Sequence, residues 1–164
     1  MRIKRIIIEG PDCSGKSTLV ERIKNTLKWD ARFLRHKDGD QFSRYLTEYA
    51  SAENVVFDRS HFSENVYSKL WRGGSPFSSR QKKILNSICQ ESTLIILACP
   101  SKKTLEERYL SREYPQQIKL KELEISRKLF INEFSNVKKK IYKSRDFTEL
   151  EVLLNQLIKI VEER

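Results

Sequence analysis

Residues 9–18, with the sequence EGPDCSGKST, constrain the fold of this chain more than any other feature. They contain two glycines five positions apart, and a lysine and two hydroxyl residues follow the second glycine. Residues 4–9 are apolar enough for a buried strand, and residues 17–27 repeat apolar side chains every four positions. We therefore predict strand, turn and helix in that order. A glycine-rich turn in this setting is typical of phosphate-binding loops.

The residue types within this loop suit a nucleoside triphosphate. Gly10 and Gly15 let the backbone turn tightly and approach an anion closely. Lys16 can reach the β- and γ-phosphates, and the hydroxyl of Ser17 can hold Mg²⁺. The helix that begins there points its positive end at the same phosphates. The loop residues that we expect to bind ATP are Gly10, Pro11, Asp12, Cys13, Ser14, Gly15, Lys16, Ser17 and Thr18.

Strands and helices are predicted to alternate along the rest of the chain. Short β-branched and apolar runs predict strands at residues 32–35, 54–58 and 93–99. Helical spacing and capping residues predict helices after Ser60, after Ser78, and over residues 104–112, 120–141 and 149–162. Glycine and proline should break the chain in RGGSP and EYPQQIK. This alternation predicts a P-loop α/β fold, a three-layer α/β/α sandwich with a central parallel sheet.

Length and composition favour one soluble domain. A chain of 164 residues can bury one core but not two separate catalytic domains, so residues 1–164 are expected to form a single domain. Cys13, Cys89 and Cys99 lack the spacing of metal ligands and suggest reduced thiols. The apolar run near the N-terminus is too short for a signal peptide and leads directly into glycine and aspartate. We therefore expect a cytoplasmic protein without a membrane partner.

The net charge of +10 bears on the partners of this chain. Such an excess of lysine and arginine attracts polyanions, which makes nucleic acids and phosphorylated substrates plausible partners. A merely lysine-rich surface is an equally good explanation. Charge therefore permits a nucleic-acid partner without identifying one.

Phosphate-binding loops occur in switches, transport ATPases and kinases, so other motifs must separate these classes. A guanine-nucleotide switch needs an Asn-Lys-x-Asp segment, and an ABC-type ATPase needs a Ser-Gly-Gly signature. The sequence contains neither. These two classes are therefore excluded.

A second motif, FDRSHFSENVY at residues 57–67, ends one predicted strand and opens the next predicted helix. Together the two motifs resemble those of thymidylate-kinase-like P-loop nucleoside and nucleotide kinases. That family pairs an E-G-x-D-x-x-G-K-S-T loop with a D-R-x-x-x-S segment. The matching residues are Glu9, Gly10, Asp12, Gly15, Lys16, Ser17, Thr18, Asp58, Arg59 and Ser63. The resemblance implies an ATP-dependent kinase with a short helical lid at about residues 108–120.

The resemblance also implies roles for individual residues. Asp58 is expected to hold Mg²⁺ through water or to accept a proton from the acceptor hydroxyl. Asp12 faces the acceptor and is the other candidate for that proton. Arg59 is expected to stabilise the phosphoryl group in transfer, as are Arg108 and Arg112 on one face of the lid helix. The expected catalytic residues are Lys16, Asp58, Arg59, Arg108, Arg112 and Asp12, with Ser17 and Asp58 at the metal. Structural ion pairs and solvated basic side chains are the alternatives.

The region after the second predicted strand departs from the family pattern. Thymidylate kinases usually grip the acceptor phosphate with an Arg-Glu-Pro-Gly segment, whereas this chain reads RHKDGDQFSRYL there. A related group of viral kinases phosphorylates 5-hydroxymethyluracil within DNA, and a compact, basic chain suits that task. We expect that acceptor slightly ahead of a free deoxynucleoside or deoxynucleoside monophosphate. A nucleic-acid-binding NTPase without kinase activity is the further alternative.

A DNA acceptor would need basic residues along the backbone and aromatic residues for stacking. The basic candidates are Arg35, His36, Lys37, Arg44, Arg72, Arg80, Lys82 and Lys83. The aromatic candidates are Phe42, Trp71 and Phe77. Each of them could equally be an ordinary core or surface residue.

Overall fold

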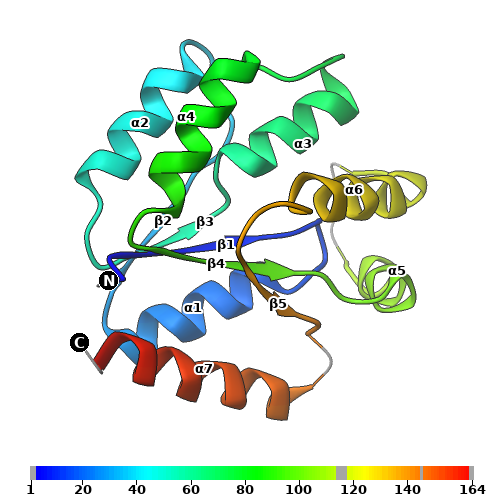
Figure 1. Ribbon diagram of the computed structural model, residues 1–164. Helices are drawn as coiled ribbons and strands as arrows, with labels where there is room; N and C mark the ends of the chain where they lie inside the picture. Colours follow the sequence, from blue (N-terminus) through cyan, green and yellow to red (C-terminus); the bar gives the residue numbers. More distant parts are fainter. Residues whose placement is uncertain (1–2, 114–117, 145, 163–164) are drawn as a thin grey trace.

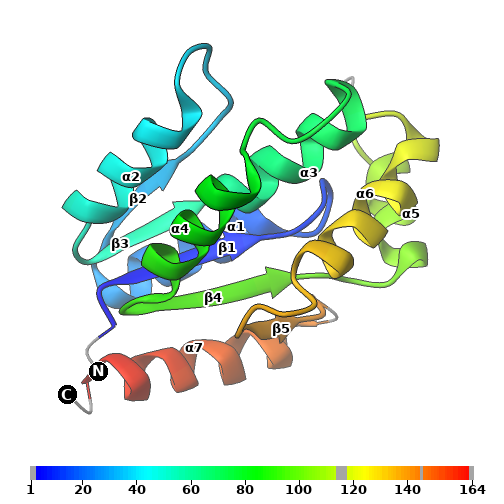
Figure 2. The same ribbon diagram turned by 45° about the horizontal axis from the view of Figure 1, so that its top comes forward.

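A computed structural model describes residues 3–113, 118–144 and 146–162. At its centre lies a five-stranded sheet with the order β2-β3-β1-β4-β5 (Figures 1 and 2). The strands are β1 (Arg5–Glu9), β2 (Asp30–Phe33), β3 (Val55–Asp58), β4 (Thr93–Ala98) and β5 (Lys140–Tyr142). All neighbouring strands run parallel. Their carboxyl ends therefore share one edge of the sheet, where ligands bind in folds of this kind.

Helices cover both faces of the sheet (Figure 1). One face carries α1 (Lys16–Leu27) and α7 (Phe147–Glu162), and the other carries α2 (Gln41–Ser51), α3 (His61–Trp71) and α4 (Ser79–Gln90). The pair α5 (Lys102–Leu110) and α6 (Leu120–Glu133) lies beside α3, near the carboxyl ends of the strands. The predicted three-layer architecture is confirmed. In the described part of the chain, no helix has both the length and the apolar composition to cross a membrane.

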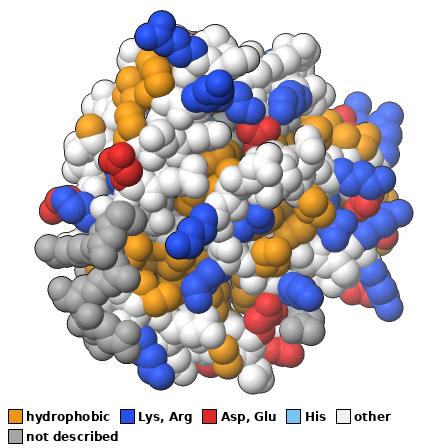
Figure 3. Space-filling view, in the orientation of Figure 1, with side chains coloured by type: hydrophobic (Ala, Val, Ile, Leu, Met, Phe, Trp, Pro, Cys, Tyr) orange, Lys and Arg blue, Asp and Glu red, His pale blue; other side chains and the backbone are white. Residues whose placement is uncertain are grey.

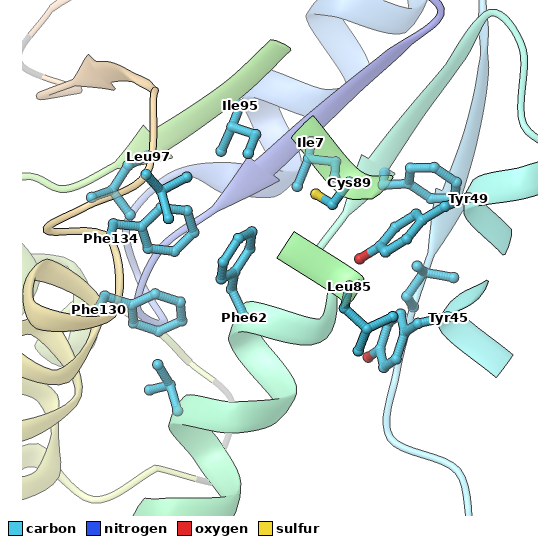
Figure 4. Packing of buried hydrophobic residues seen from close by; sticks show 14 of the residues in the cluster. Ile7, Tyr45, Tyr49, Phe62, Leu85, Cys89, Ile95, Leu97, Phe130 and Phe134 are labelled. Atoms are coloured by element: carbon cyan, nitrogen blue, oxygen red, sulfur yellow. The ribbon is translucent and has the colours of Figure 1, made fainter. Parts of the chain in front are cut away.

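Side chains of β1 alternate between the two halves of the core. Ile7 packs on the side of α2, α3, α4 and α6, whereas Ile6 and Ile8 pack on the side of α1 and α7. Figure 4 shows Ile7 in the first half, in the same cluster as Phe62 and Phe134. All three isoleucines are fully buried. Apolar residues on both faces of a strand are what a parallel sheet covered by helices requires.

Two predicted helix starts are confirmed by their caps. The hydroxyl of Ser60 accepts a hydrogen bond from the backbone N–H of Phe62 at 3.3 Å, where α3 begins. Ser78 and Gln81 form a reciprocal capping box at the start of α4, with bonds of 3.3 and 2.9 Å. Because the first cap lies two residues after β3, α3 starts at the ligand-binding edge of the sheet.

The helix predicted over residues 120–141 is wrong in its second half. Helix α6 ends at Glu133, and Lys140–Tyr142 forms the edge strand β5. The backbone N–H of Cys99 donates to the carbonyl oxygen of Tyr142 at 2.8 Å. Ile141 is 60% exposed, so its helical spacing from Val137 does not reflect a shared buried face. Pairing with β4 satisfies backbone groups that the helix would otherwise have satisfied.

The sequence analysis did not predict α2, and it placed β2 two residues too late. The buried face of α2 contains Tyr45 and Tyr49, four positions apart, and the side chain of Asp40 caps its first turn at 3.2 Å. A four-residue spacing after a capping aspartate would have indicated this helix.

The predicted lid helix is displaced toward the N-terminus. Helix α5 ends at Leu110, so Arg112 follows the helix, and the prediction that Arg108 and Arg112 share a helical face is wrong. The predicted lid at about residues 108–120 includes residues 114–117, which lie outside the described part of the chain.

Candidate functional site

The loop between β1 and α1 requires glycine at two positions. At Gly10, φ is +144°, and a Cβ atom would lie 2.1 Å from the carbonyl oxygen of Ala98. At Gly15, φ is +86°, and a Cβ atom would lie 2.9 Å from the hydroxyl of Ser144. Gly15 is also the residue from which α1 starts. The turn thus places a helix N-terminus against the end of β1, the geometry that binds a phosphate.

Lys16 is the cation that this loop encloses. Its side chain is buried, and Nζ donates a hydrogen bond to the carbonyl oxygen of Pro11 at 2.7 Å. Burial, together with the positive charge of Arg59, lowers the pKa of Lys16 to about 8. A desolvated ammonium group with one neutral partner gains a stronger interaction when a phosphate oxygen approaches.

Ser17 and Asp58 meet at the entrance of the loop, as predicted. The hydroxyl of Ser17 donates to Oδ2 of Asp58 at 3.4 Å. Burial raises the pKa of Asp58, while the charges of Lys16 and Arg59 oppose that rise. Among the described residues, Oδ1 of Asp58 is buried without a hydrogen-bond partner. An oxygen of this kind beside a hydroxyl fits the ligand set of a hard cation.

The metal would need further oxygen ligands from the nucleotide. Within the described residues, no group of three or more His, Cys, Asp or Glu side chains could hold a metal by itself. Mg²⁺ usually binds through one or two protein groups, water and substrate phosphates. The pair of Ser17 and Asp58 therefore fits Mg²⁺ that arrives with a nucleotide.

Asp12 and Arg59 join the phosphate-binding loop to the turn after β3. Nη2 of Arg59 donates to Oδ1 of Asp12 at 2.8 Å, and the hydroxyl of Tyr67 donates to Oδ2 at 3.0 Å. Burial would raise the pKa of Asp12, but the charges of Lys16 and Arg59 outweigh it and lower that pKa. The guanidinium of Arg59 also lies over the ring of Tyr67, 4.8 Å from its centroid. The carboxylate therefore stays ionised and fixed in direction.

Glu9 stabilises the turn that carries Arg59. It is fully buried at the end of β1, and its carboxylate accepts hydrogen bonds from the hydroxyls of Ser60 and Ser63 and from the backbone N–H of Ser63. Burial raises the pKa of Glu9 to about 7, although these hydrogen bonds oppose the rise. The residue between β3 and Ser60 is Arg59, whose backbone has φ of +74°. Glu9 thus holds the turn that presents the guanidinium.

A cavity of about 590 Å³ opens beside Asp12 and Arg59. Three aromatic side chains contribute to its wall, namely Phe33, Tyr67 and Trp71. The rings of Tyr67 and Trp71 stack at 4.9 Å with an angle of 22°. The remaining lining includes the basic side chains Arg35, His36 and Arg72, the carboxylate of Glu64, and Leu34, Ser63 and Ile118. The volume suits one nucleoside or nucleotide.

Arg108 reaches the loop from the opposite side. Its Nη2 donates to the carbonyl oxygen of Ser144 at 2.8 Å and to the Ser144 hydroxyl at 3.0 Å, while Nη1 donates to the carbonyl oxygen of Cys13 at 3.4 Å. The charge of Arg112 is close enough to lower the pKa of Cys13, against the larger effect of burial. Both arginines therefore lie near the loop, although they do not share a helix. Figure 3 shows other Lys and Arg side chains along this edge, over α5 and α6.

The structure thus brings the predicted site residues together around one loop. Cys13 and Ser14 are buried within it, and the hydroxyl of Ser14 has no partner among the described residues. Pro11 contributes its carbonyl oxygen, and Ser17 and Thr18 are exposed at the start of α1. Their roles toward ATP, Mg²⁺ and the acceptor stay predictions.

The residues predicted for a DNA acceptor divide into three groups. Arg35, His36, Trp71 and Arg72 line the cavity. Phe77, in contrast, is buried in the core and cannot stack on a base without unfolding. The other candidates lie away from the lining of this cavity, namely Lys37, Phe42, Arg44, Arg80, Lys82 and Lys83.

The sequence analysis missed Glu64 and Tyr67 as site residues. A signal was present, because Phe62, Val66 and Leu70 repeat every four residues and form the apolar face of this helix. The next positions, Ser63, Tyr67 and Trp71, repeat every four residues along α3, and Glu64 lies one position further, at the same spacing from Ser68 and Arg72. On a helix that starts beside a phosphate-binding loop, that polar and aromatic stripe indicates a ligand-facing surface.

Comparisons with known proteins agree with this architecture. No protein-family model matches the chain. It is 32% identical over 85 residues to the SPbeta prophage-derived uncharacterized protein YorR of Bacillus subtilis (strain 168). That match covers 49% of this chain and 52% of the relative, so the chain spans about half the length of the curated relative it matches.

Solved structures resemble the chain over most of its length. The YorR protein from Bacillus subtilis, in complex with phosphorylated GDP, has a TM-score of 0.83 at 21% identity, covering 96% of this chain and 95% of that one. Deoxyadenosine kinase from M. mycoides with bound dCTP has a TM-score of 0.62 at 18% identity, over 93% and 98%. Shikimate kinase from Acinetobacter baumannii with shikimate has a TM-score of 0.64 at 9% identity, over 98% and 94%. The chain therefore has the fold of the P-loop kinases.

Proposed function

We propose that this chain is an ATP-dependent kinase that transfers the γ-phosphoryl group to a nucleoside-type acceptor. One observation carries the proposal: the cavity of about 590 Å³ lies directly beside the phosphate-binding loop and shares Asp12 with it. A switch or motor needs a site for one nucleotide, whereas a kinase needs a second site next to the γ-phosphate. The nucleotide complexes of YorR and of deoxyadenosine kinase support a nucleotide-type ligand.

The residues of the loop would hold the donor. Lys16 exchanges its hydrogen bond with Pro11 for phosphate oxygens, and its burial strengthens that interaction. Ser17 and Asp58 would hold Mg²⁺, which would supply positive charge to offset that of the phosphates. Arg108 enters from the side of Ser144 and stabilises the charge on the transferring group.

The residues at the cavity would hold the acceptor. Asp12, kept ionised by Lys16 and Arg59, accepts a hydrogen bond from the acceptor hydroxyl and directs its oxygen toward the γ-phosphorus. That oxygen bonds to phosphorus as the bond to the bridging oxygen breaks, ADP leaves with the electron pair, and the proton of the hydroxyl passes to the carboxylate of Asp12. Arg59 donates to the equatorial oxygens during the transfer. The stacked rings of Tyr67 and Trp71 supply a flat wall for a base.

A free deoxynucleoside or deoxynucleoside monophosphate is the leading acceptor. The cavity has the volume of one such molecule, and Arg35 in its wall suits an anionic group. The second candidate is 5-hydroxymethyluracil in DNA. Exposed Trp71 and the basic residues at the same cavity favour it, because an extruded base would enter where a free nucleoside does.

The test is to supply labelled ATP with thymidine, thymidylate, ordinary DNA and hydroxymethyluracil DNA, and to follow the label. Transfer to the free compounds alone supports the leading acceptor, and transfer to modified DNA alone supports the second. The substitution Lys16→Ala should abolish transfer, whereas Lys24→Ala on the same helix should not. ATP turnover with no labelled product across a full nucleoside and nucleotide panel would mean an NTPase without kinase activity.

A further inference from the structure

Glu64 is a buried carboxylate that faces ligand space. It is 4% exposed, yet it lines the 590 Å³ cavity and a neighbouring cavity of about 380 Å³. Its Oε1 accepts hydrogen bonds from Nδ1 of His36 at 2.8 Å, from Nη2 of Arg72 at 2.5 Å and from the hydroxyl of Ser68 at 3.2 Å. Three donors fill the capacity of one carboxylate oxygen.

The other oxygen of Glu64 is left open. Oε2 accepts no hydrogen bond from the described residues, and it is not among their fully enclosed unpaired atoms. Nη1 of Arg72 is similarly unused, because the side-chain hydrogen bonds of Arg72 to described residues employ Nε and Nη2. The wall of the cavity therefore offers one acceptor on Glu64 and one donor on Arg72, two side chains joined by the bond from Nη2 to Oε1.

A second buried carboxylate, that of Glu133, has no open oxygen. An open carboxylate oxygen is therefore not a general feature of buried acids in this fold. Glu133 is also enclosed by two cations, Lys69 at 3.0 Å and Lys82 at 2.7 Å. These cations bond to different oxygens, one to Oε2 and one to Oε1, so Glu133 is satisfied on both sides. Glu133 lines neither cavity. Glu133 is therefore part of a structural ion-pair network, whereas Glu64 keeps one carboxylate oxygen, Oε2, without a partner among the described residues at the cavity.

We infer that Glu64 selects the base of the acceptor, with Oε2 accepting from a ring N–H and Arg72 donating to the adjacent carbonyl oxygen. A base with one ring N–H beside a carbonyl group pairs with both Oε2 of Glu64 and the donor of Arg72, and it leaves no hydrogen unpaired. An exocyclic amino group would bring two hydrogens to one open acceptor. The acceptor class is therefore the oxo-type pyrimidines, thymine and uracil. This inference rests on the proposed nucleoside-type acceptor, because Tyr67 and Trp71 supply the stacking wall for the same base.

The substitution Glu64→Gln tests this inference because it should replace the acceptor that faces the base with a donor. His36, Arg72 and Ser68 all donate, so the amide oxygen will face them and the amide NH₂ will take the place of Oε2. The variant then presents a donor to a base N–H. It should favour bases with a ring-nitrogen acceptor beside a carbonyl group, such as cytosine. Glu133→Gln is the matched control, because it also neutralises a buried carboxylate between two cations.

The measurements are calorimetric binding and phosphate transfer with thymidylate, N3-methylthymidylate, deoxyguanylate, deoxycytidylate and deoxyadenylate. In the unsubstituted protein, N3-methylation should weaken binding by about 10- to 100-fold. Glu64→Gln should lower the ratio of thymidylate to deoxycytidylate binding at least tenfold, while Glu133→Gln leaves it unchanged. If Glu64→Gln and Glu133→Gln lower the melting temperature equally, the loss of base preference in Glu64→Gln is not caused by a folding defect.

Two results would overturn the inference, and both differ from failure of the proposed function. Either N3-methylation leaves binding unaffected, or Glu64→Gln keeps the base preference of the unsubstituted protein. Base-selective binding without transfer of phosphate would instead support the role of Glu64 and refute the kinase reaction. Transfer without any base preference would support the kinase and refute the role of Glu64.

Discussion

The guanidinium of Arg59 lies 2.8 Å from the carboxylate of Asp12, and this contact closes the phosphate-binding loop onto the turn after β3. Each side chain keeps about a fifth of its surface exposed, so a ligand in the cavity can reach both of them. The contact therefore belongs to the site and is not a sealed structural pair. Asp12 lines the cavity from the donor loop, and Arg59 lines it from the acceptor side.

We expect Arg59→Ala to lower phosphate transfer about 100- to 1000-fold, because a preplaced guanidinium that stabilises the transferring group contributes on that scale. The dissociation constant for ATP should change less than about threefold, because Lys16 and the loop backbone hold the donor. Steady-state kinetics and calorimetry would measure the two effects. The control is Arg32→Ala, which removes an exposed ion pair with Glu48. An equal loss in both variants would contradict a catalytic role for Arg59.

The sequence predicted the donor half of the site because that half is local. Gly10, Gly15, Lys16 and Ser17 act within one turn, and the strand before and helix after them fix their directions. Asp58 and Arg59 could also be placed, because they end a recognisable strand and all parallel strands end at one edge. Local spacing and strand order were enough for these residues.

The acceptor half depends on contacts between distant segments, and the sequence predicted less of it. His36 and Glu64 meet 28 positions apart, with α2 and β3 between them, so no local spacing connects the two residues. The same reason explains the missed β5, since three residues carry no periodicity and become a strand only beside β4. Ser144, which holds Arg108, follows that strand and was missed with it.

Gly15 should tolerate no side chain, for a reason that can be separated from backbone strain. Its φ is +86°, and Gly73 has a similar φ of +76°. A Cβ atom at Gly15 would crowd Ser144 and Arg108, whereas one at Gly73 would meet nothing within 4 Å. Gly73→Ala should therefore cost only the strain of about 1 kcal/mol, and Gly15→Ala should also abolish ATP binding. Urea unfolding and calorimetry would test this, and normal ATP binding by Gly15→Ala would refute it.

Glu9 should make the stability of the protein depend on pH. Burial raises its pKa from an ordinary value of 4.5 to about 7 in the folded chain. Between these values the folded protein keeps a proton that the unfolded chain has released, so stability should fall as the pH rises from about 4.5 to 7. The change is about 3 kcal/mol at most. Below pH 4.5 and above pH 7 this contribution no longer varies.

The substitution Glu9→Gln should remove that dependence. Urea unfolding at several pH values would give the difference in free energy between the variant and the unsubstituted protein, and this difference should grow in favour of the variant from pH 5 to 7. The exposed Glu21 is the control, because Glu21→Gln removes a carboxylate of ordinary exposure. A difference that stays constant with pH would mean that Glu9 is ionised in both states.

Trp71 and Phe77 were both predicted to stack on bases, and the structure predicts opposite consequences for their loss. Trp71 is 41% exposed and stacks on Tyr67 at the cavity, whereas Phe77 is 5% exposed in the core. Trp71→Ala should raise the KM for the acceptor about tenfold and change stability by less than about 1 kcal/mol, because it removes a stacking surface but few core contacts.

Phe77→Ala should cost about 3 kcal/mol of stability, because it leaves a cavity among Tyr45, His61 and neighbouring side chains. Its KM for the acceptor should stay within twofold at a temperature where the variant is folded. Thermal unfolding and acceptor titrations on the same samples would decide, and a raised KM in Phe77→Ala alone would reverse the two assignments.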